Sequence, residues 1–168
     1  MTTIHPHLQA QARIATPLGP MTAAATAAGL AGLWFDDQAH HPGPLPVPVD
    51  ADHPHLRAAA RALQAYFGGA ADPLQGVPLD MHGTPFQQAV WQRLIALPRG
   101  ATSTYGQIAA GAGSPAAVRA AGAAIGRNPV SVLVPCHRVL GSNGGLTGYA
   151  GGLHRKTALL QGEGVLLA

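Results

Sequence analysis

The residue pattern changes near position 80, and this change limits the folds that the chain can adopt. Before it, residues 13–16 and 30–35 have the composition of β-strands bounded by glycine and proline, a proline-rich crossing follows, and apolar residues recur at helical spacing over 56–67. After it, helix-start signals dominate. We therefore predict an α+β protein with a small α/β scaffold domain over residues 1–80 and a mainly helical domain over residues 81–168.

Composition and charge restrict the classes of function. The chain is 47% hydrophobic and 10% charged, which permits a buried core and excludes wholesale disorder. Its formal net charge of +3 suits a nucleic-acid partner without demonstrating one. Cys136 is the only cysteine, so no internal disulfide can form, as expected in a reducing cytoplasm. The first six residues lack a signal-peptide pattern, and the apolar stretch 21–35 is too short to span a bilayer. We expect a soluble, cytoplasmic protein.

The second half opens with strong helix signals. Thr84 can cap a helix, Pro85 fits its first position, and Gln87 can close a capping box. A short helix is predicted over about 104–110, and after a glycine turn the Ser-Pro pair at 114–115 predicts the start of another. Two short helices joined by a glycine turn have the shape of a helix-turn-helix, which is a weak signal by itself.

The last of these helices has two different faces. One is predicted to be a buried apolar stripe, and it contains Val118, Ala121, Gly122 and Ile125. The other carries small side chains and two arginines: Ala116, Arg119, Ala120, Ala123 and Arg127. Small side chains permit close approach to a DNA groove, and arginines bind phosphates or fill gaps in stacked bases. An alanine-rich surface helix with solvated arginines is the alternative.

Cys136 and His137 form the candidate reactive pair. A thiol is a good nucleophile only as the thiolate, which a neighbouring imidazole favours. The β-branched run at 131–134 predicts a strand leading into this pair, and in a strand the two side chains would point to opposite faces. His137 would then need a bent backbone or a bridging water. The alternative is an inert, packed cysteine.

Two further features lie downstream of this pair. Residues 144–152 form a glycine-rich loop of the kind that lets a ligand approach the backbone. A final helix is predicted over about 153–162, and Glu163 follows it. Because a carboxylate is unfavourable at a helix C-terminus, Glu163 is either solvated or held by a partner, for which His137 is a candidate.

Residues 83–164 closely resemble the C-terminal domain of the O6-alkylguanine-DNA alkyltransferases. The ordered series of matching segments is Gly83-Thr84-Pro85-Phe86-Gln87, Val90-Trp91, Pro98-Arg99-Gly100, Ser103-Thr104-Tyr105, Arg119-Ala120, Asn128-Pro129, Pro135-Cys136-His137-Arg138-Val139, Gly148-Tyr149, Gly151-Gly152, Lys156, Leu159-Leu160 and Glu163-Gly164. Residues 16–20 and 30–37 match the family's N-terminal domain more weakly. The resemblance implies a ribonuclease-H-like first domain and a winged-helix-like second domain with a helix-turn-helix.

The resemblance also implies a partner, which is double-stranded DNA carrying O6-alkylguanine, bound from the minor-groove side with the damaged nucleotide rotated out of the stack. Arg119 would replace the rotated base, and Tyr105 would lie at the phosphate turn and the guanine edge. Ser114, Ala120 and Arg127 would be further DNA contacts. We expect a monomer, and the sequence leaves open both clustering on DNA and activity on O4-alkylthymine.

The implied chemistry is irreversible transfer of the alkyl group to Cys136, once per protein molecule and without a cofactor. His137 would take the thiol proton, Glu163 would orient His137, and Asn128 would brace the joint before the Cys136 segment. The guanine pocket would be walled by Val139, Tyr149, Ala150, Gly151 and Gly152.

The sequence departs from the family pattern at two points, and two other functions compete with alkyl transfer. Ala150 stands where some members have a hydroxyl residue, which removes a possible donor to the guanine oxygen. A thiolate zinc site is excluded because Cys136 is the only cysteine, and we predict no metal site. Six histidines are expected to be solvated rather than metal-bound: His5, His7, His40, His41, His53 and His55. The rivals are a lesion-binding module without chemistry and a Cys-His hydrolase.

Overall fold

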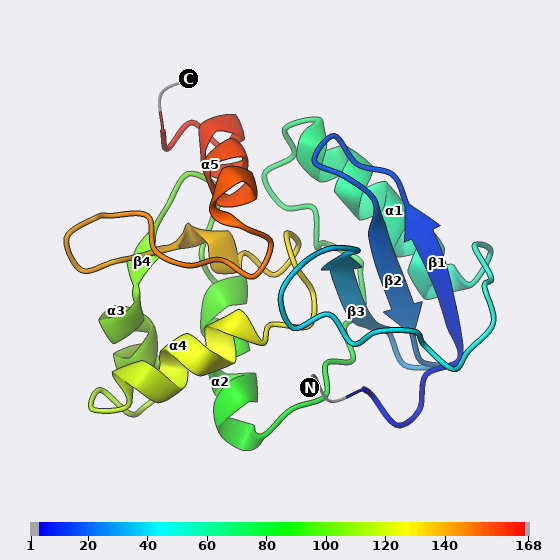
Figure 1. The fold of residues 1–168 in the computed structure, drawn as a ribbon, viewed down its shortest axis with the longest axis horizontal. Helices are drawn as coiled ribbons and strands as arrows, with labels where there is room; N and C mark the ends of the chain where they lie inside the picture. Colours follow the sequence, from blue (N-terminus) through cyan, green and yellow to red (C-terminus); the bar gives the residue numbers. More distant parts are fainter. Residues whose placement is uncertain (1–3, 167–168) are drawn as a thin grey trace. The chain divides into compact units, whose positions relative to one another are not determined.

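The computed structural model describes residues 4–166, and its chain folds into two compact units (Figure 1). The first unit comprises Met1–His82 and the short segment Pro129–Leu133, and the second comprises Gly83–Asn128 and Val134–Ala168. The chain therefore leaves the second unit once and returns to it immediately before Cys136, whereas the sequence analysis predicted two uninterrupted domains.

The first unit is a three-stranded antiparallel sheet with one helix on it. Its strands are β1 (Ala10–Ile14), β2 (Met21–Ala25) and β3 (Leu30–Phe35), in the spatial order β1-β2-β3. Helix α1 (Pro54–Phe67) lies along one face of the sheet (Figure 1) and buries its apolar stripe there. The helix starts where proline is tolerated, at its first position, with His53 as the N-cap.

Two sequence-based expectations for this sheet were wrong. The first strand lies at Ala10–Ile14 rather than at 13–16, and β2 was not predicted at all. Strand β2 is rich in alanine and is buried along nearly its whole length between β1 and β3, so it shows no alternation of apolar and polar residues.

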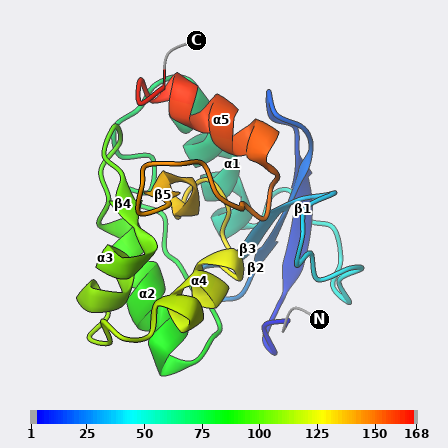
Figure 2. The same cartoon turned by 60° about the vertical axis from the view of Figure 1, so that its left-hand side comes forward.

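The second unit is mainly helical. It contains α2 (Pro85–Ile95), β4 (Ser103–Thr104), α3 (Tyr105–Gly111), α4 (Val118–Gly126), the 3₁₀ helix η1 (Cys136–Arg138), β5 (Val139–Leu140) and α5 (Leu153–Gly162). Capping boxes start α2 at Thr84 and α3 at Thr104. Helices α2, α3 and α4 pack on one another (Figure 2), and the Trp91 indole of α2 donates to the carbonyl oxygen of Ala124 in α4 over 2.9 Å.

Helix α4 starts later than its sequence indicated. The Ser-Pro pair at 114–115 lies in a turn, and the helix begins at Val118 with Ala117 as an N-cap that has no side-chain acceptor. Val118, which was predicted to be buried, is 40% exposed. The exposed surface of α4 is therefore wider and more apolar at its start than expected.

The segment before Cys136 is not the strand that its β-branched residues predicted. It makes only two ladder bonds with β3, from Leu33 N to Pro129 O (2.7 Å) and from Ser131 N to Leu33 O (2.9 Å). A γ-turn follows at Val132, whose φ is +72° and which is bridged by Leu133 N donating to Ser131 O over 2.9 Å. This is the rarer and more strained form of γ-turn. Propensity for β structure is overridden here by the local turns.

Together these elements give a mixed α/β architecture with small sheets. Over residues 4–166, every helix is too short or too polar to cross a membrane.

Candidate active site

Cys136 is the first residue of the 3₁₀ helix η1 and is almost fully buried, with 5% of its surface exposed. A second γ-turn, centred on Pro135, immediately precedes Cys136. Pro135 has φ −83° and ψ 64°, and Cys136 N donates to Val134 O over 2.8 Å. This bent backbone replaces the extended one that the sequence analysis considered. In a helix with three residues per turn, the next side chain, His137, points away from the preceding thiol by about a third of a turn.

Glu163 lies at the C-cap of α5 and is buried against two cationic or donor groups. His137 Nε2 lies 2.6 Å from Glu163 Oε2, and Arg138 Nε donates to Oε1 over 2.7 Å. The Arg138 guanidinium also donates to Leu97 O over 2.6 Å. Its positive charge offsets the unfavourable position of a carboxylate at a helix C-terminus. Of the two possibilities left open by the sequence, Glu163 is therefore held by partners rather than solvated.

Burial keeps both Cys136 and His137 uncharged. It raises the pKa of the Cys136 thiol above its ordinary value, although the Asn128 side chain and the Lys156 charge act in the opposite direction. Burial also lowers the pKa of His137, opposed by its hydrogen bond with Glu163. Near neutral pH the pair is thus a thiol beside a neutral imidazole. When Nε2–H of that imidazole donates to Glu163, Nδ1 carries the lone pair and can accept a proton.

Two side chains hold the backbone around the thiol. Asn128 Nδ2 donates to Val134 O over 2.8 Å, which closes the excursion of the chain through the first unit. Lys156 is 0% exposed, and its Nζ donates to Val139 O over 2.6 Å and to Thr147 O over 3.1 Å. Lys156 therefore joins β5 to the glycine-rich loop while placing a positive charge close to Cys136.

The residues predicted to wall a guanine pocket lie on β5 and in the loop before α5. Val139 and Gly151 are buried, while Tyr149, Ala150 and Gly152 are partly exposed. The Tyr149 and His137 rings meet edge to face with centroids 6.4 Å apart, so the loop reaches the imidazole. Arg155 Nη1 donates to Gly151 O over 3.1 Å and anchors the far end of the loop.

The residues predicted to contact DNA lie on α3, α4 and the turn between them (Figure 2). Arg119 and Ala120 are exposed on α4, Arg127 is exposed at its C-cap, and Ser114 is partly exposed in the preceding turn. Tyr105, the first residue of α3, is partly exposed, and its hydroxyl lies 2.8 Å from Thr147 Oγ1.

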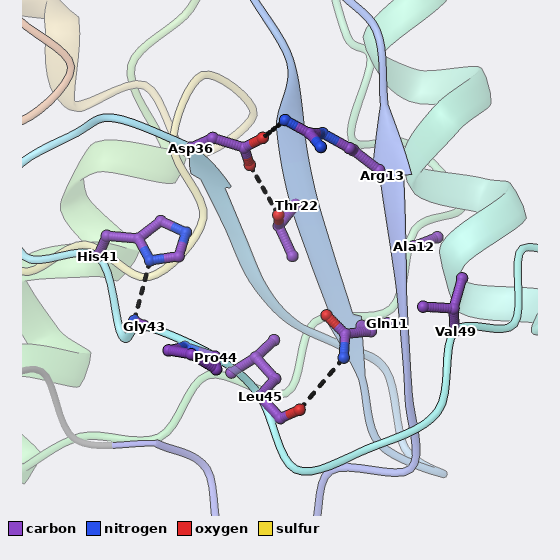
Figure 3. Close-up of a pocket in the computed structure, with 10 residues that line it drawn as sticks. All are labelled: Gln11, Ala12, Arg13, Thr22, Asp36, His41, Gly43, Pro44, Leu45 and Val49. Atoms are coloured by element: carbon purple, nitrogen blue, oxygen red, sulfur yellow. Dashed lines mark hydrogen bonds and ion pairs between the residues drawn. The ribbon is translucent and has the colours of Figure 1, made fainter.

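Two hollows lie elsewhere, in the first unit. One of about 420 Å³ lies between the sheet and the proline-rich crossing, where Arg13 pairs with Asp36 and Thr22 Oγ1 donates to Asp36 over 2.8 Å (Figure 3). The other, of about 240 Å³, lies beside α1. Neither is lined by Cys136 or by the predicted pocket residues. Within residues 4–166, His, Cys, Asp and Glu side chains form no group of three or more that could hold a metal ion.

Comparison with known proteins identifies the family of the chain. The family model described as "6-O-methylguanine DNA methyltransferase, DNA binding domain" matches residues 85–165. The methylated-DNA–protein-cysteine methyltransferase of Mycobacterium tuberculosis is 43% identical over 150 residues, which cover 89% of each chain. The chain belongs to the methylated-DNA–protein-cysteine methyltransferase family. A Salmonella typhimurium member is 54% identical over 105 residues, which cover 62% of this chain and 61% of that protein.

Solved structures of family members have the same fold. The M. tuberculosis protein OGT, crystallised in complex with DNA, superposes with a TM-score of 0.82 at 41% identity, covering 92% of both chains. The O6-methylguanine-DNA methyltransferase of Pyrococcus kodakaraensis gives a TM-score of 0.63 at 23% identity, which shows a shared fold alone.

Three residues of this methyltransferase site were given no role by the sequence analysis: Arg138, Lys156 and Thr147. A signal for Lys156 was present, because it lies three and four positions before Leu159 and Leu160 and hence on the apolar face of α5. A lysine on such a face needs buried acceptors. No comparable signal marked Arg138 or Thr147, whose partners are distant in sequence.

Proposed function

We propose that this protein repairs DNA by direct reversal, transferring the alkyl group from O6 of an alkylated guanine to Sγ of Cys136. Membership of the methyltransferase family supports this proposal, and so do the names of its relatives. The observation that carries it is the arrangement at Cys136, where a buried thiol is followed in sequence by a neutral imidazole that is held by a buried carboxylate.

The proposed reaction begins with proton transfer. Because the thiol is protonated near neutral pH, it requires a base, and His137 takes its proton while Glu163 stabilises the resulting imidazolium. The sulfur then attacks the alkyl carbon, and the C–O6 bond breaks as the S–C bond forms. The bonding electrons leave with guanine O6, to which Tyr105 donates a hydrogen bond, and the guanine recovers a proton from His137 through solvent. The thioether product is stable, so each molecule reacts once.

The proposed partner is duplex DNA, approached through α3 and α4 from the minor groove. Rotation of the damaged nucleotide costs about a few kcal/mol, and Arg119 fills the space that it leaves. Tyr105, Ser114, Ala120 and Arg127 contact the DNA around it. The exposure of the arginines on a surface of small side chains supports this assignment. One chain suffices because nucleophile, base and carboxylate all come from it, so we infer a monomeric functional unit.

The remaining assignments follow from the same proposal. Val139, Tyr149, Ala150, Gly151 and Gly152 wall the pocket for the rotated guanine, and Asn128 braces the Cys136 segment through its bond to Val134. The first unit has a ribonuclease-H-like fold, and the second is a winged-helix-like variant of the helix-turn-helix. The reaction takes place in the cytoplasm, where a lone thiol stays reduced.

Intact mass measurement tests the function. Incubation with a duplex that carries O6-methylguanine is expected to add one methylene unit per chain, located at Cys136, and Cys136→Ser is expected to add none. Binding of the duplex without a mass change would instead identify a lesion-binding module. Repeated turnover of an ester substrate would identify a Cys-His hydrolase.

A further inference from the structure

Thr147 is held from two sides in the loop that precedes α5. Its carbonyl oxygen accepts from the buried Lys156 Nζ over 3.1 Å, and its hydroxyl lies 2.8 Å from the Tyr105 hydroxyl. The Tyr105 hydroxyl also lies 3.5 Å from Gly148 O. The two contacts differ in kind, because the lysine contact is part-buried and made by a charged donor, whereas the hydroxyl pair is neutral and exposed.

The same loop also contacts His137 of the reactive pair. Tyr149 follows Thr147 by two residues, and its ring lies edge to face with His137 at 6.4 Å between centroids. With Cys136 only 5% exposed, a base cannot contact the sulfur unless nearby atoms move. Glycines at 144, 145, 148, 151 and 152 make the loop the segment of this site with the greatest backbone freedom.

The Tyr105–Thr147 bond is suited to exchange. An exposed bond between neutral hydroxyls can be replaced by bonds to water or to a ligand at small cost, whereas the part-buried, charged Lys156 contact is more costly to replace. Tyr105 also lies at the start of α3, and according to the proposed function its hydroxyl can contact a phosphate of bound DNA there. A phosphate oxygen is a stronger acceptor than a threonine hydroxyl because it is charged.

We propose that Thr147 determines which substrates reach Cys136. Its hydroxyl group holds the loop 147–152 to Tyr105, and we call this hydrogen bond the latch. The latch breaks when bound DNA replaces Thr147 as the hydrogen-bond partner of Tyr105. This inference rests on the proposed function. In the free protein the latch keeps the loop over the thiol, and it disfavours reaction with free alkylated bases. A duplex recruits the Tyr105 hydroxyl, to its backbone as it binds and to guanine O6 once the base has rotated, and the released loop admits the rotated base while Lys156 keeps the loop anchored. Thr147 is thus a specificity-determining residue that favours alkyl groups carried by DNA.

The test compares two substrates on one pair of variants. Thr147→Val removes the hydroxyl at nearly constant volume, and Thr147→Ser retains it. The rate constant for alkylation of Cys136 is measured with free O6-benzylguanine and with a duplex carrying O6-methylguanine. Loss of one exposed hydrogen bond is expected to accelerate the reaction of Thr147→Val with the free base about 2- to 10-fold. The duplex reaction should change by less than about twofold, and Thr147→Ser should behave as the native protein.

Ser142→Ala, an exposed change elsewhere in the same loop, is the matched control and should alter neither rate. An unchanged or slower free-base reaction in Thr147→Val would overturn the latch, as would equal acceleration with both substrates. If the native protein accepts no alkyl group from either substrate, the proposed function itself fails, which is a different result.

Hydrogen exchange gives a readout that does not depend on alkylation. Thr147→Val and Tyr105→Phe should each accelerate exchange of the Gly152 amide, which donates to Tyr149 O across the loop over 2.9 Å. Combining the two changes should produce no further acceleration, because both remove the same bond. Amides inside α5 should exchange as in the native protein. Additive effects of the two changes would contradict a shared latch.

Discussion

Lys156 influences Cys136 through charge rather than through direct participation in bond making. Its ammonium group donates hydrogen bonds to two backbone carbonyl oxygens. Among the described residues, no carboxylate forms an ion pair with it. Burial lowers the pKa of Lys156, while the nearby thiolate favours its charged form. The thiolate of Cys136 is in turn favoured by that charge. The two groups therefore support each other's ionised state during the reaction.

Replacing Lys156 by Met should raise the pKa of the Cys136 thiol further, because one of the influences that lower it is lost. At neutral pH less thiolate is then available, and alkylation by free O6-benzylguanine should slow by roughly tenfold for each pKa unit gained. The rising limb of the pH–rate profile should move to higher pH, whereas Lys156→Arg, which keeps the charge, should leave it nearer its native position. A slower reaction with an unmoved profile would indicate a purely structural role for Lys156.

Arg119 has a role that can be separated from the chemistry. It is exposed on α4 among alanines, so its removal should leave the surroundings of Cys136 intact. Arg119→Ala should slow repair of a duplex about 10- to 100-fold, because nothing then compensates the unstacking cost of a few kcal/mol. Reaction with free O6-benzylguanine needs no rotation and should persist. Equal losses with both substrates would place Arg119 in the fold or the pocket instead.

At the scale of elements, the most unusual one is the pair of γ-turns that leads into η1. His40 and Val132 are the non-glycine residues with positive φ among residues 4–166. Val132 is β-branched, and for such a residue this conformation costs about 1–3 kcal/mol. The surrounding bonds hold it there, from β3 on one side and from Asn128 to Val134 on the other.

This conformation reverses the usual order of two substitutions. At an ordinary position alanine is more stable than glycine by about 0.5–1 kcal/mol, because glycine loses more backbone entropy on folding. At Val132 both substitutions remove the two buried γ-methyl groups, but only glycine adopts a φ of +72° without strain. Val132→Gly should therefore unfold at higher urea than Val132→Ala. The same pair at Val134, which is also buried but lacks a positive φ, should show the ordinary order.

Elements that depend on local chemistry could be predicted, and elements that depend on tertiary contacts could not. The capping box at Thr84 lies entirely within four residues, so the sequence determines the start of α2. The β-branched run at 131–134 predicted a strand, but prolines on either side and two bonds to Leu33 produce turns instead. The partners of Glu163 are 25 and 26 residues away, so only the fold selects between solvation and burial.

At the scale of the whole molecule, the chain that leads into Cys136 is divided between the two units. Residues 129–133 belong to the first unit, and Asn128 and Val134, on either side of them, belong to the second. The first unit therefore does more than precede the reactive one in sequence, since it contributes the strand contacts that hold the chain immediately before Pro135 and Cys136. This connection is why the two predicted domains could not be drawn as uninterrupted ranges.

The response of DNA binding to salt also belongs to this scale, because it depends on which cations of this basic chain, with its formal net charge of +3, contact phosphates. Each phosphate neutralised by a basic side chain releases condensed counterions, so affinity for a duplex should fall linearly on a log–log plot against salt concentration. Arg127→Ala, which removes one exposed cation at the C-cap of α4, should make the slope less negative by about one. Arg61→Ala, which removes an exposed cation of α1 in the first unit, should leave the slope unchanged. The affinity is measured by fluorescence anisotropy. An affinity that does not depend on salt concentration would contradict phosphate contacts by α4. Equal effects of the two variants on the slope would show that overall charge, rather than this helix, governs binding.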